Sequence, residues 1–271
     1  MNKTWLGLES KTVIVTGGAS GIGKAVAQEF LNNGANVVVC DMNPNKPEFD
    51  EANGKFEYVI TNVASKESVE EMITKTKEAF GSIDIIVNNA GINIPRLLVD
   101  PKEANGEFEL GEAVWDKVMN VNVKGVFICS QLAAREMVKK GNGVIINMSS
   151  ESGLEGSEGQ SVYAASKNAV NSLTRSWSKE LGKLGVRVVG VAPGILEATG
   201  LRTLEYETAL AYTRGITVDD LRAGYSKTST TPLGRSGKLS EVADLVCYLA
   251  SDRAGYIHGV TYNVAGGKTR G

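Results

Sequence analysis

Short runs of apolar, mostly β-branched residues recur along the chain and alternate with longer segments in which apolar residues return every three or four positions. The short runs predict β-strands, and the longer segments predict amphipathic helices. The predicted strands are TVIVT (residues 12–16), NVVVC (36–40), FEYVIT (56–61), IDIIVNN (83–89), GVIINMSS (143–150), VRVVGVAP (186–193) and VTYNVAG (260–266). Because these runs alternate with helices and are apolar at nearly every position, they are typical of a parallel sheet covered on both faces. We therefore predict an α/β fold with a doubly wound parallel sheet of about seven strands and helices on both faces.

Two stretches interrupt this rhythm. RLLVDPKEANGEFELG (residues 96–111) is irregular, and residues 195–237 are rich in Thr, Tyr and Arg and too long for an ordinary connection. Both follow a predicted strand, and ligands of open α/β sheets bind beyond the carboxyl ends of the strands. Residues 195–237 are therefore predicted to form a substrate lid, with a packing or oligomer flap as the alternative. No repeat or linker divides the chain, so residues 1–271 are predicted to form a single domain.

Composition narrows the range of functions. The chain has 271 residues, of which 42% are apolar, and its formal net charge is −2 with acidic and basic residues interspersed. This composition supports a large core and offers no broad electrostatic surface for nucleic acid or an anionic membrane. No apolar run approaches the roughly 18 residues that span a bilayer, and residues 1–11 lack the apolar centre of a signal peptide. We expect a cytoplasmic protein whose partner is a small molecule.

Metal and disulfide chemistry find little support in the sequence. Cys40, Cys129 and Cys247 are widely separated in apolar surroundings, which favours buried thiols over disulfides or metal ligands. His258 is the only histidine. We therefore expect no metal site and no histidine-based catalytic triad.

The segment after the first predicted strand is rich in glycine. TGGASGIG (residues 16–23) places glycines at positions 17, 21 and 23, ahead of an amphipathic helical segment. Glycines permit a tight turn and a close approach of the backbone to a pyrophosphate, whose charge is favoured by the N-terminus of the next helix. The second strand leads to Asp41, 18 residues beyond Gly23, where a carboxylate can bind a ribose diol and repels the 2′-phosphate of NADP. The pattern predicts an NAD site.

Four motifs in this order resemble those of one family. TGGASGIG, NNAG (residues 88–91), YAASK (163–167) and PG (193–194) are similar to motifs of the short-chain dehydrogenase/reductase family, and the resemblance covers essentially the whole chain. It implies a Rossmann-like fold, hydride transfer between a nicotinamide cofactor and a secondary alcohol or ketone, and a homotetramer. The residues implied to bind the cofactor are Gly17, Ser20, Gly21, Ile22, Gly23, Asp41, Asn62, Val63, Asn89, Ala90, Gly91, Tyr163, Lys167, Pro193, Gly194 and Ile195.

Some of these positions carry separate expectations. By the resemblance, Asn89 lines the adenine-ribose side of the cofactor and Val63 lies beside the adenine. Asn88 and Asn89 also suit the capping of strand ends or the bridging of strands. Asn62 stands where the family usually has Asp, and it keeps an acceptor while adding an amide donor.

The segment after PG departs from the family pattern. The backbone of Ile195 is implied to meet the nicotinamide amide. Ala198 stands where the family usually has a threonine. Thr199 takes the threonine's role only through a shift of one residue.

Tyr163 and Lys167 lie four positions apart in SVYAASK (residues 161–167) and therefore share a helix face. Such a pair alone is usually no more than an amphipathic surface. A tyrosine has an ordinary pKa near 10, and a nearby ammonium stabilises its phenolate. We predict that Lys167 lowers the pKa of Tyr163, which then gives a proton to a carbonyl oxygen or removes one from a hydroxyl. The resemblance also implies that Lys167 holds the nicotinamide ribose.

The resemblance implies two further catalytic residues. Ser150 stands 13 residues before Tyr163 at a strand end, the spacing of the family's catalytic serine, and competes with its neighbour Ser149. Its hydroxyl is expected to hold the substrate oxygen for proton transfer. Asn122 in NVKGVF matches an asparagine that holds a water near the lysine in a helix bend, with Asn120 as its competitor. Asparagine is unfavourable inside a helix, which supports a special role.

Polar residues at the predicted cleft argue against a steroid or fatty-acyl pocket. PGILEATGLRT (residues 193–203), KTSTTPLGRSGKLSEVADLVCYLASDRA (227–254) and NVAGGKTRG (263–271) resemble bacterial members of the family that interconvert sorbitol 6-phosphate and fructose 6-phosphate with NAD. Arginine and lysine suit a phosphate, and the basic tail that carries Lys268 is expected to reach its own cleft or a neighbour's. The candidate substrate residues are Arg96, Glu151, Arg202, Arg235 and Lys268.

Three alternatives remain at this point. The substrate could be another polyol, a sugar acid or an acyl thioester. A nucleotide-sensing binding protein would keep the fold without turnover, but all four catalytic positions are filled. An assembly module is the third alternative, because residues 240–251 and 260–264 resemble segments through which family members form tetramers, although the same apolar pattern also covers a sheet.

Overall fold

Seven parallel strands form one sheet. The computed structural model describes residues 5–200, 202–226 and 231–269. The strands are β1 (Thr12–Thr16), β2 (Asn36–Asp41), β3 (Lys55–Ile60), β4 (Ile85–Asn88), β5 (Gly143–Met148), β6 (Val186–Pro193) and β7 (Thr261–Val264). Their spatial order is β3-β2-β1-β4-β5-β6-β7, and each neighbouring pair is parallel. The predicted Rossmann-like, doubly wound α/β fold is confirmed.

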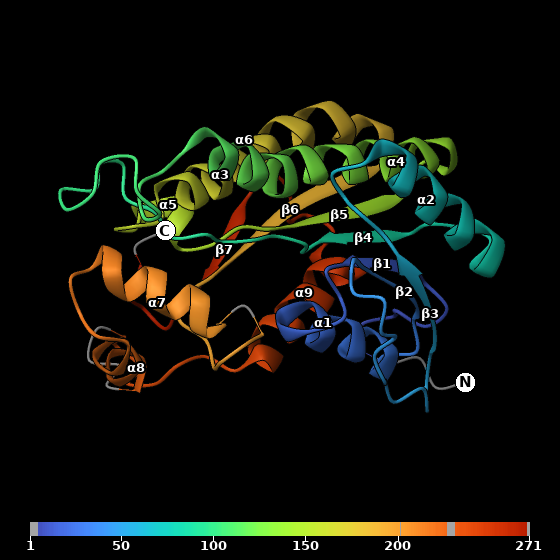
Figure 1. Cartoon of the computed structure of the whole chain (residues 1–271). Helices are drawn as coiled ribbons and strands as arrows, with labels where there is room; N and C mark the ends of the chain where they lie inside the picture. The colour runs from blue at the N-terminus through green and yellow to red at the C-terminus, as the bar shows by residue number, and fades with distance from the viewer. Residues whose placement is uncertain (1–4, 201, 227–230, 270–271) are drawn as a thin grey trace.

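Helices cover both faces of the sheet (Figure 1). On one face lie α1 (Gly21–Asn32) and α9 (Leu239–Ala250), and on the other lie α2 (Lys66–Phe80), α4 (Gly125–Lys140) and α6 (Ser161–Leu181). A π-helical turn, η1 (Asn120–Lys124), joins α3 (Glu112–Met119) to α4. The 3-10 turns η2 (Gly182–Leu184) and η3 (Asp252–Ala254) follow α6 and α9. Both faces need this cover because the strands are apolar on both sides.

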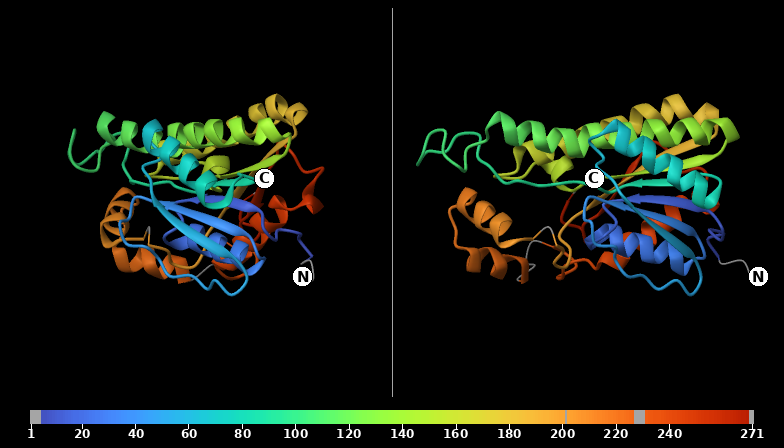
Figure 2. Two further views of the ribbon diagram at one scale, coloured as in Figure 1. Left: turned by 90° about the vertical axis from the view of Figure 1, so that its right-hand side faces the viewer. Right: turned by 45° about the vertical axis from the view of Figure 1, so that its right-hand side comes forward.

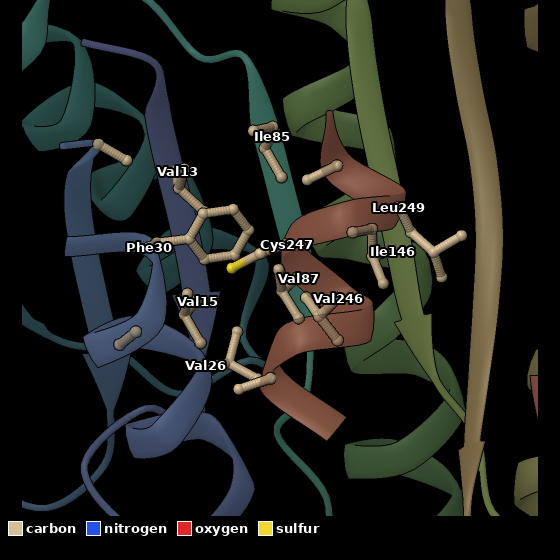
Figure 3. Packing of buried hydrophobic residues seen from close by; sticks show 14 of the residues in the cluster. Val13, Val15, Val26, Phe30, Ile85, Val87, Ile146, Val246, Cys247 and Leu249 are labelled. Carbon is tan, nitrogen blue, oxygen red and sulfur yellow. The ribbon is translucent and has the colours of Figure 1, made fainter. Parts of the chain in front are cut away.

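The alternation of side chains along each strand divides the core in two. In β1, Val13 and Val15 belong to the cluster under α1 and α9, where Phe30 and Cys247 are fully buried (Figure 3). Ile14 belongs to the second cluster, which includes residues of α2 and α4. Successive residues of a strand point to opposite faces, so one strand anchors both helical layers.

The strand order reverses in the middle of the sheet. The chain builds β1, β2 and β3 outward to one edge and then returns to place β4 on the other side of β1. The loops that follow β1 and β4 therefore diverge at the carboxyl ends of adjacent strands. Open α/β sheets bind their ligands at this switch point.

Three further helices lie near the carboxyl ends of the strands. They are α5 (Ser152–Glu155), α7 (Leu204–Thr213) and α8 (Val218–Ser226). Figure 2 shows α7 and α8 apart from the helices that cover the sheet, at the end of the molecule away from the N-terminus. Leu210 and Leu221 bury their side chains where these two helices meet. The region predicted as a lid thus contains two packed helices, while residue 201 and residues 227–230 of it lie outside the described residues.

The structure also describes the surroundings of the three cysteines and of the single histidine. Cys40, Cys129 and Cys247 are buried free thiols. The His258 ring accepts the N–H of Val188 at 3.0 Å through Nδ1, so it packs between strands and helices. Across residues 5–200, 202–226 and 231–269, no helix has the length and apolar character to cross a membrane. The same residues hold no group of three or more His, Cys, Asp or Glu side chains placed to bind a metal ion.

Candidate active site

A cleft opens at the carboxyl edge of the sheet, between the loops that follow β1 and β4. It encloses about 310 Å³, which is within the range of small-molecule sites. Loops from both halves of the sheet supply its walls. The predicted cofactor residues that line it are Gly17, Ser20, Gly21, Ile22, Asp41, Asn62, Val63, Asn89, Ala90, Gly91, Tyr163, Lys167 and Pro193.

Close backbone packing requires glycine in the turn between β1 and α1. Gly17 has a φ of +63°, and a Cβ at this position would lie 2.8 Å from the Cα of Ala90. A Cβ at Gly23 would lie 2.2 Å from the carbonyl oxygen of Gly17. Gly23 therefore lets the start of α1 press against the turn, which places it behind the cleft rather than in its wall.

The N-terminus of α1 is free to receive an anion. Ser20 is the residue before the first turn, and its side chain makes no capping hydrogen bond. The first N–H groups of a helix have no partner inside the helix and attract negative charge. Together with the close approach that Gly17 permits, this end of the helix fits the pyrophosphate of a dinucleotide.

Asp41 ends β2 at the rim of the cleft. Its Oδ2 accepts the N–H of Ala19 at 3.1 Å, and its Oδ1 accepts the N–H of Asn43 at 3.1 Å. The carboxylate thus ties the glycine turn to the end of β2. Each oxygen retains a second lone pair, so the half-buried side chain can also accept the hydroxyls of a ribose.

The two asparagines after β4 hold the strand ends together. Asn88 is buried and donates to side chains on α4 and β5 at 2.8 Å each, which is the bridging alternative. The Nδ2 of Asn89 donates to the carbonyl oxygens of Thr16 and Gly17 at 3.0 Å each. Asn89 therefore fastens the glycine turn to β4 while it lines the cleft.

Asn62 and Val63 follow β3 and line the same cleft. The Oδ1 of Asn62 accepts the N–H of Ala64 at 3.0 Å, which leaves its exposed amide nitrogen as a donor. Val63 is 7% exposed and packs in the core cluster under α2. An amide donor beside an apolar surface suits a purine ring.

Ser150 and Tyr163 meet across the sheet from Asp41. The Ser150 hydroxyl interacts with the Tyr163 phenol and favours its ionised form, and the Ser150 hydroxyl also accepts the N–H of Ser152 at 3.2 Å. Ser149 instead donates to the carbonyl oxygen of Lys167 at 3.1 Å in a buried position. Of the two serines, Ser150 is the one that is joined to Tyr163.

Lys167 lies one helical turn beyond Tyr163 on α6. Its Nζ donates to the carbonyl oxygen of Met148 at 2.9 Å and lies 5.7 Å from the centroid of the Tyr163 ring. The residue is only 4% exposed, and burial lowers its pKa to about 8. The ammonium is thus held under the phenol and gives up its proton more readily than an exposed lysine.

The prediction that Lys167 lowers the pKa of Tyr163 is wrong for this structure. Burial raises the pKa of Tyr163 above its ordinary value, a hydrogen bond with Ser150 opposes the rise, and the negative charge of Glu151 adds to it. The physical reason is that desolvation of the phenol dominates. The Lys167 ammonium meanwhile binds a carbonyl oxygen.

Asn122 is fully buried in the π-helical turn η1. Its Oδ1 accepts the N–H of Ile92 at 2.8 Å, and its Nδ2 donates to the carbonyl oxygen of Ile92 at 2.9 Å and to the hydroxyl of Ser166 at 3.0 Å. π-Helical turns within helices are frequent at functional sites. Here the amide fixes the segment after β4 against α6, and Asn122 itself does not line the cleft.

The loop after β6 places its residues differently from the prediction. Gly194 and Ile195 do not line the cleft, and the Ile195 carbonyl oxygen accepts the N–H of Gly237 at 3.0 Å. Thr199 lies against the glycine turn, because a Cβ at Gly21 would be 3.3 Å from the Cβ of Thr199. Thr199, rather than Ala198, therefore closes the cleft over that turn. Of the two competing serines, Ser149 lines the cleft and Ser150 does not. The other lining residues that the sequence did not single out are Met42, Thr61, Ile92, Val121, Met148 and Gly200.

Two of the predicted substrate residues meet beside Ser150. The Nζ of Lys268 lies 2.6 Å from Oε1 of Glu151, and the Oγ1 of Thr269 donates to Oε2 of Glu151 at 2.9 Å. The C-terminal tail thus contacts Glu151, which follows Ser150 in the chain, although none of the side chains of Glu151, Lys268 and Thr269 lines the cleft. Arg270, which belongs to the same basic tail, lies outside the described residues.

The three predicted arginines have different surroundings. The Arg96 guanidinium lies 5.6 Å from the Phe108 ring centroid, and the Arg202 guanidinium lies 3.5 Å from that of Tyr225. Arg235 is not brought to the cleft: its two terminal nitrogens bind the Glu241 carboxylate at 2.8 and 2.5 Å, at the start of α9. The role of Arg235 as a phosphate ligand therefore stays a prediction, and it requires the guanidinium to leave Glu241.

Sequence reasoning missed Gln160, which joins three segments. Its Oε1 accepts the Nδ2 of Asn93 at 3.2 Å, and its Nε2 donates to the hydroxyl of Tyr206 on α7 at 3.1 Å. Burial raises the pKa of Tyr206, and Tyr163 is among its electrostatic neighbours. Gln160 stands three residues before Tyr163, so the helical spacing that singled out Lys167 could also have found it.

A family comparison decides the assignment of the chain. A family model described as short chain dehydrogenase matches residues 11–209. The chain belongs to the short-chain dehydrogenase family. It is therefore an oxidoreductase of a family that uses a nicotinamide cofactor, and the glycine turn and cleft fit such a group.

Individual relatives of this short-chain dehydrogenase differ in their substrates. The chain is 59% identical over 268 residues, 99% of each sequence, to sorbitol-6-phosphate 2-dehydrogenase of Klebsiella pneumoniae. It is 38% identical over 268 residues, 96% of this chain and 98% of the other, to 3-oxoacyl-[acyl-carrier-protein] reductase FabG of Thermotoga maritima. The crystal structure of levodione reductase aligns with a TM-score of 0.82 and 28% identity over 96% of this chain and 98% of the other.

Proposed function

We propose that this protein is an NAD-dependent dehydrogenase that interconverts sorbitol 6-phosphate and fructose 6-phosphate. The observation that carries this proposal is the 59% identity, over 99% of both sequences, to the Klebsiella pneumoniae enzyme with that substrate in its name. Tyr163 and Lys167 line the cleft that also contains the glycine turn, and Ser150 interacts with Tyr163, which supports the reaction type.

Four residues have separate roles in the proposed reaction. The bound cofactor supplies the hydride acceptor and, when oxidised, a positive charge that favours the phenolate of Tyr163. Tyr163 removes the proton of the substrate hydroxyl during oxidation and returns it to the ketone oxygen in the reverse direction. Ser150 holds the substrate oxygen by a hydrogen bond, and Lys167 holds the ribose beneath it. Asn122 acts as a positioning residue, because it fixes the backbone of Ile92 at the cleft wall.

The preference for NAD over NADP rests on Asp41. Its carboxylate lines the cleft at the end of β2, where a 2′-phosphate would meet a like charge at a cost of several kcal/mol. The next residues, Met42 and Asn43, carry no positive charge that could compensate. Their neutral side chains support a ribose without a phosphate.

The phosphate of the substrate lies four carbons from the reacting hydroxyl and needs a cation at that distance from Tyr163. Lys268 is the best-placed of the candidates, since its partner Glu151 directly follows Ser150. Arg96 and Arg202 remain candidates because their guanidinium groups lie over aromatic rings and have donors to spare. A phosphate can receive hydrogen bonds from more than one of these groups.

A substrate panel tests the proposal. NADH formation at 340 nm is measured with sorbitol 6-phosphate, sorbitol, other polyols and their phosphates, and NADPH formation with NADP in place of NAD. A 3-oxoacyl thioester is included in the reductive direction, because a relative of 38% identity has that activity in its name. We expect the highest kcat/KM with sorbitol 6-phosphate and NAD. Equal values with and without the phosphate would refute the substrate assignment.

The same resemblance supports proposals for the oligomeric state, the location and the partners of the protein. We propose a cytoplasmic homotetramer whose partner is a polyol phosphate or sugar phosphate, without a nucleic-acid or membrane partner. The balanced charge of −2 supports the absence of a nucleic-acid surface.

A further inference from the structure

A buried ion pair links the C-terminal segment to the strand end that carries Ser150. Glu151 is 9% exposed, and the side chains of Glu151 and Lys268 are 12% and 27% exposed. Lys268 contacts one carboxylate oxygen and Thr269 donates to the other, while Asn263 on β7 holds the carbonyl oxygen of Thr269 at 2.9 Å. The carboxylate is therefore gripped on both oxygens by residues more than a hundred positions away.

The order of the strands produces this contact. β5, β6 and β7 are neighbours in the sheet, so their carboxyl ends meet at one edge. Backbone hydrogen bonds continue past the strand ends, from Glu151 N–H to the Pro193 carbonyl oxygen at 3.0 Å and from Gly194 N–H to the Val264 carbonyl oxygen at 3.0 Å. The Glu151 side chain lies over Gly194, where a Cβ would be 2.9 Å from Oε2. The absence of a side chain at Gly194 gives the carboxylate room to reach the tail.

Stability alone does not account for a buried pair of this kind. Two charges lose hydration when they are buried, and an apolar pair of similar size often stabilises a fold as well or better. Glu151 directly follows Ser150 in the chain, and its charge is felt by Tyr163. These two observations point to a role of the Glu151–Lys268 pair in the reaction rather than in folding.

Few other charged or titratable groups face Tyr163 in the described residues. Lys167 lies on the same helix, 5.7 Å from the ring centroid. Tyr206 approaches from α7, and burial raises its pKa so that it stays neutral at working pH. Glu151, at the end of β5, is the anion that acts on Tyr163, and Lys268 is the cation bound to it.

We propose that the C-terminal segment is part of the active site. Lys268 and Thr269 hold the Glu151 carboxylate beside Ser150 and Tyr163. The charges of Glu151 and Lys268 together determine the electrostatic potential at the Tyr163 hydroxyl. Glu151 is a positioning residue in this arrangement, because it acts through Tyr163. The proposal rests on the role of Tyr163 in the proposed function, and it holds for whichever alcohol is the substrate.

The two charges of the pair act on Tyr163 in opposite directions. The anion disfavours the phenolate, so its removal in Glu151→Gln lowers the pKa of Tyr163. Removal of the cation in Lys268→Met leaves the anion unbalanced and raises the pKa of Tyr163. Oxidation of an alcohol needs the phenolate of Tyr163. The pH at which kcat/KM reaches half of its plateau therefore shifts in the same direction as the pKa of Tyr163.

The test is a set of pH profiles of kcat/KM for alcohol oxidation in the full-length protein. We expect the half-maximal pH to fall in Glu151→Gln and to rise in Lys268→Met, each by about half a unit or more, which is a threefold change in activity on the sloping limb. The double variant is expected to lie between the two single variants, because it removes both charges together. Lys183→Met and Glu78→Gln remove exposed charges at a distance from the cleft and are expected to leave the profile unchanged.

Shifts in the same direction, or no shift in either single variant, would overturn the proposal. Cofactor binding and thermal unfolding are measured for each variant, since a purely structural role would lower stability and plateau activity without opposite displacements of the profile. The failure of the proposed function is distinguished by Tyr163→Phe. If that variant keeps the sloping limb, the assignment of Tyr163 fails, whatever the two charge variants do.

Discussion

At the scale of single residues, the site separates groups that hold the backbone from groups that reach the cleft. Asn89 and Asn122 use their amides on backbone atoms of the glycine turn and of Ile92. Tyr163 and Lys167 line the cleft, and Ser150 interacts with Tyr163. Substitutions in the first set are expected to act through geometry, and those in the second through chemistry.

Replacement of Tyr163 by Phe removes the hydroxyl and keeps the ring. We expect kcat to fall by about 10² to 10⁴, the usual contribution of a positioned acid or base, while the affinity for NAD changes little. Initial rates of NADH formation and a fluorescence titration with NADH measure the two quantities. Tyr256→Phe is the matched control, because Tyr256 is fully exposed. A Tyr163→Phe variant with more than a tenth of the wild-type kcat would contradict this role.

The buried Lys167 makes stability depend on pH. Its pKa falls from 10.5 in an exposed lysine to about 8 in the folded chain. Between pH 8 and pH 10.5 the unfolded chain binds a proton at Lys167 that the folded chain lacks. The contribution of Lys167 to the free energy of unfolding therefore increases with pH across this window and is lowest below pH 8. Relative to Lys167→Met, the wild-type unfolding free energy is expected to rise by about 2 kcal/mol between pH 7 and pH 10. Urea denaturation of both proteins at several pH values measures the difference, and a constant difference would show that Lys167 titrates normally.

The residues that sequence could indicate are those whose role depends on local spacing. Tyr163 and Lys167 share a helix face because they are four residues apart, and Gly17 is required by the positive φ of its turn. The Glu151–Lys268 contact spans 117 positions and depends on which strands are neighbours in the sheet. The direction of the pKa shift of Tyr163 was missed for a related reason, because burial is a property of the whole fold.

At the scale of elements, α7 is attached to the loop that follows β4. The Tyr212 hydroxyl donates to Oδ2 of Asp100 at 2.8 Å, and the rings of Tyr212 and Phe108 stack with centroids 4.0 Å apart. Asp100 is 3% exposed. The two irregular regions of the sequence thus contact each other near the carboxyl ends of the strands.

Tyr212→Phe is expected to loosen this attachment while keeping the stacked ring. Loss of this hydrogen bond to a carboxylate is expected to weaken the contact between α7 and the loop after β4. We expect a roughly threefold to tenfold higher KM for the sugar phosphate and faster amide hydrogen exchange in residues 204–213 and 97–110. NAD affinity should change much less, because Tyr212 does not line the cleft. Unchanged exchange and an unchanged KM would show that the contact does not control access to the site.

The strands of the fold could be predicted from the sequence, but the helices α7 and α8 within residues 195–237 could not. Each of the seven strands overlaps its predicted run, because a buried parallel strand is apolar along its whole length. α7 lacks a single apolar face, since Leu210 packs toward α8 while Tyr206 and Tyr212 contact other segments. When several sides of a helix contact different segments, the apolar residues of that helix do not recur with a simple period along the sequence.

At the scale of the whole molecule, sheet order gathers residues that are distant in the chain. β1 and β4 diverge at the switch point and open the cofactor cleft, while the ends of β5, β6 and β7 bring Ser150, the PG motif and the tail together. The cofactor half and the chemical half of the site therefore come from the two halves of one sheet.

The surface of the chain carries apolar side chains that a monomer would leave in water. On the helical layer of α3 and α4, Trp115 and Phe127 are 46% and 42% exposed, and near the outer strand β7, Val260 and Tyr262 are 45% and 37% exposed. Phe127 also lines a hollow between α4 and α6 together with Trp177. Large exposed apolar areas mark interaction surfaces, so these two areas are where we expect contacts between subunits.

We expect light scattering to give a mass of about 115 kDa, four times the 28.8 kDa of one chain. Phe127→Glu places a charge in one of the two areas, which costs several kcal/mol when the charge is buried at an interface. This variant is therefore expected to assemble only through the other area and to run as a dimer of about half that mass. Lys183→Met serves as a surface control and should remain a tetramer. A monomeric wild-type protein at micromolar concentration, or a tetrameric Phe127→Glu variant, would contradict the use of this helical surface in assembly.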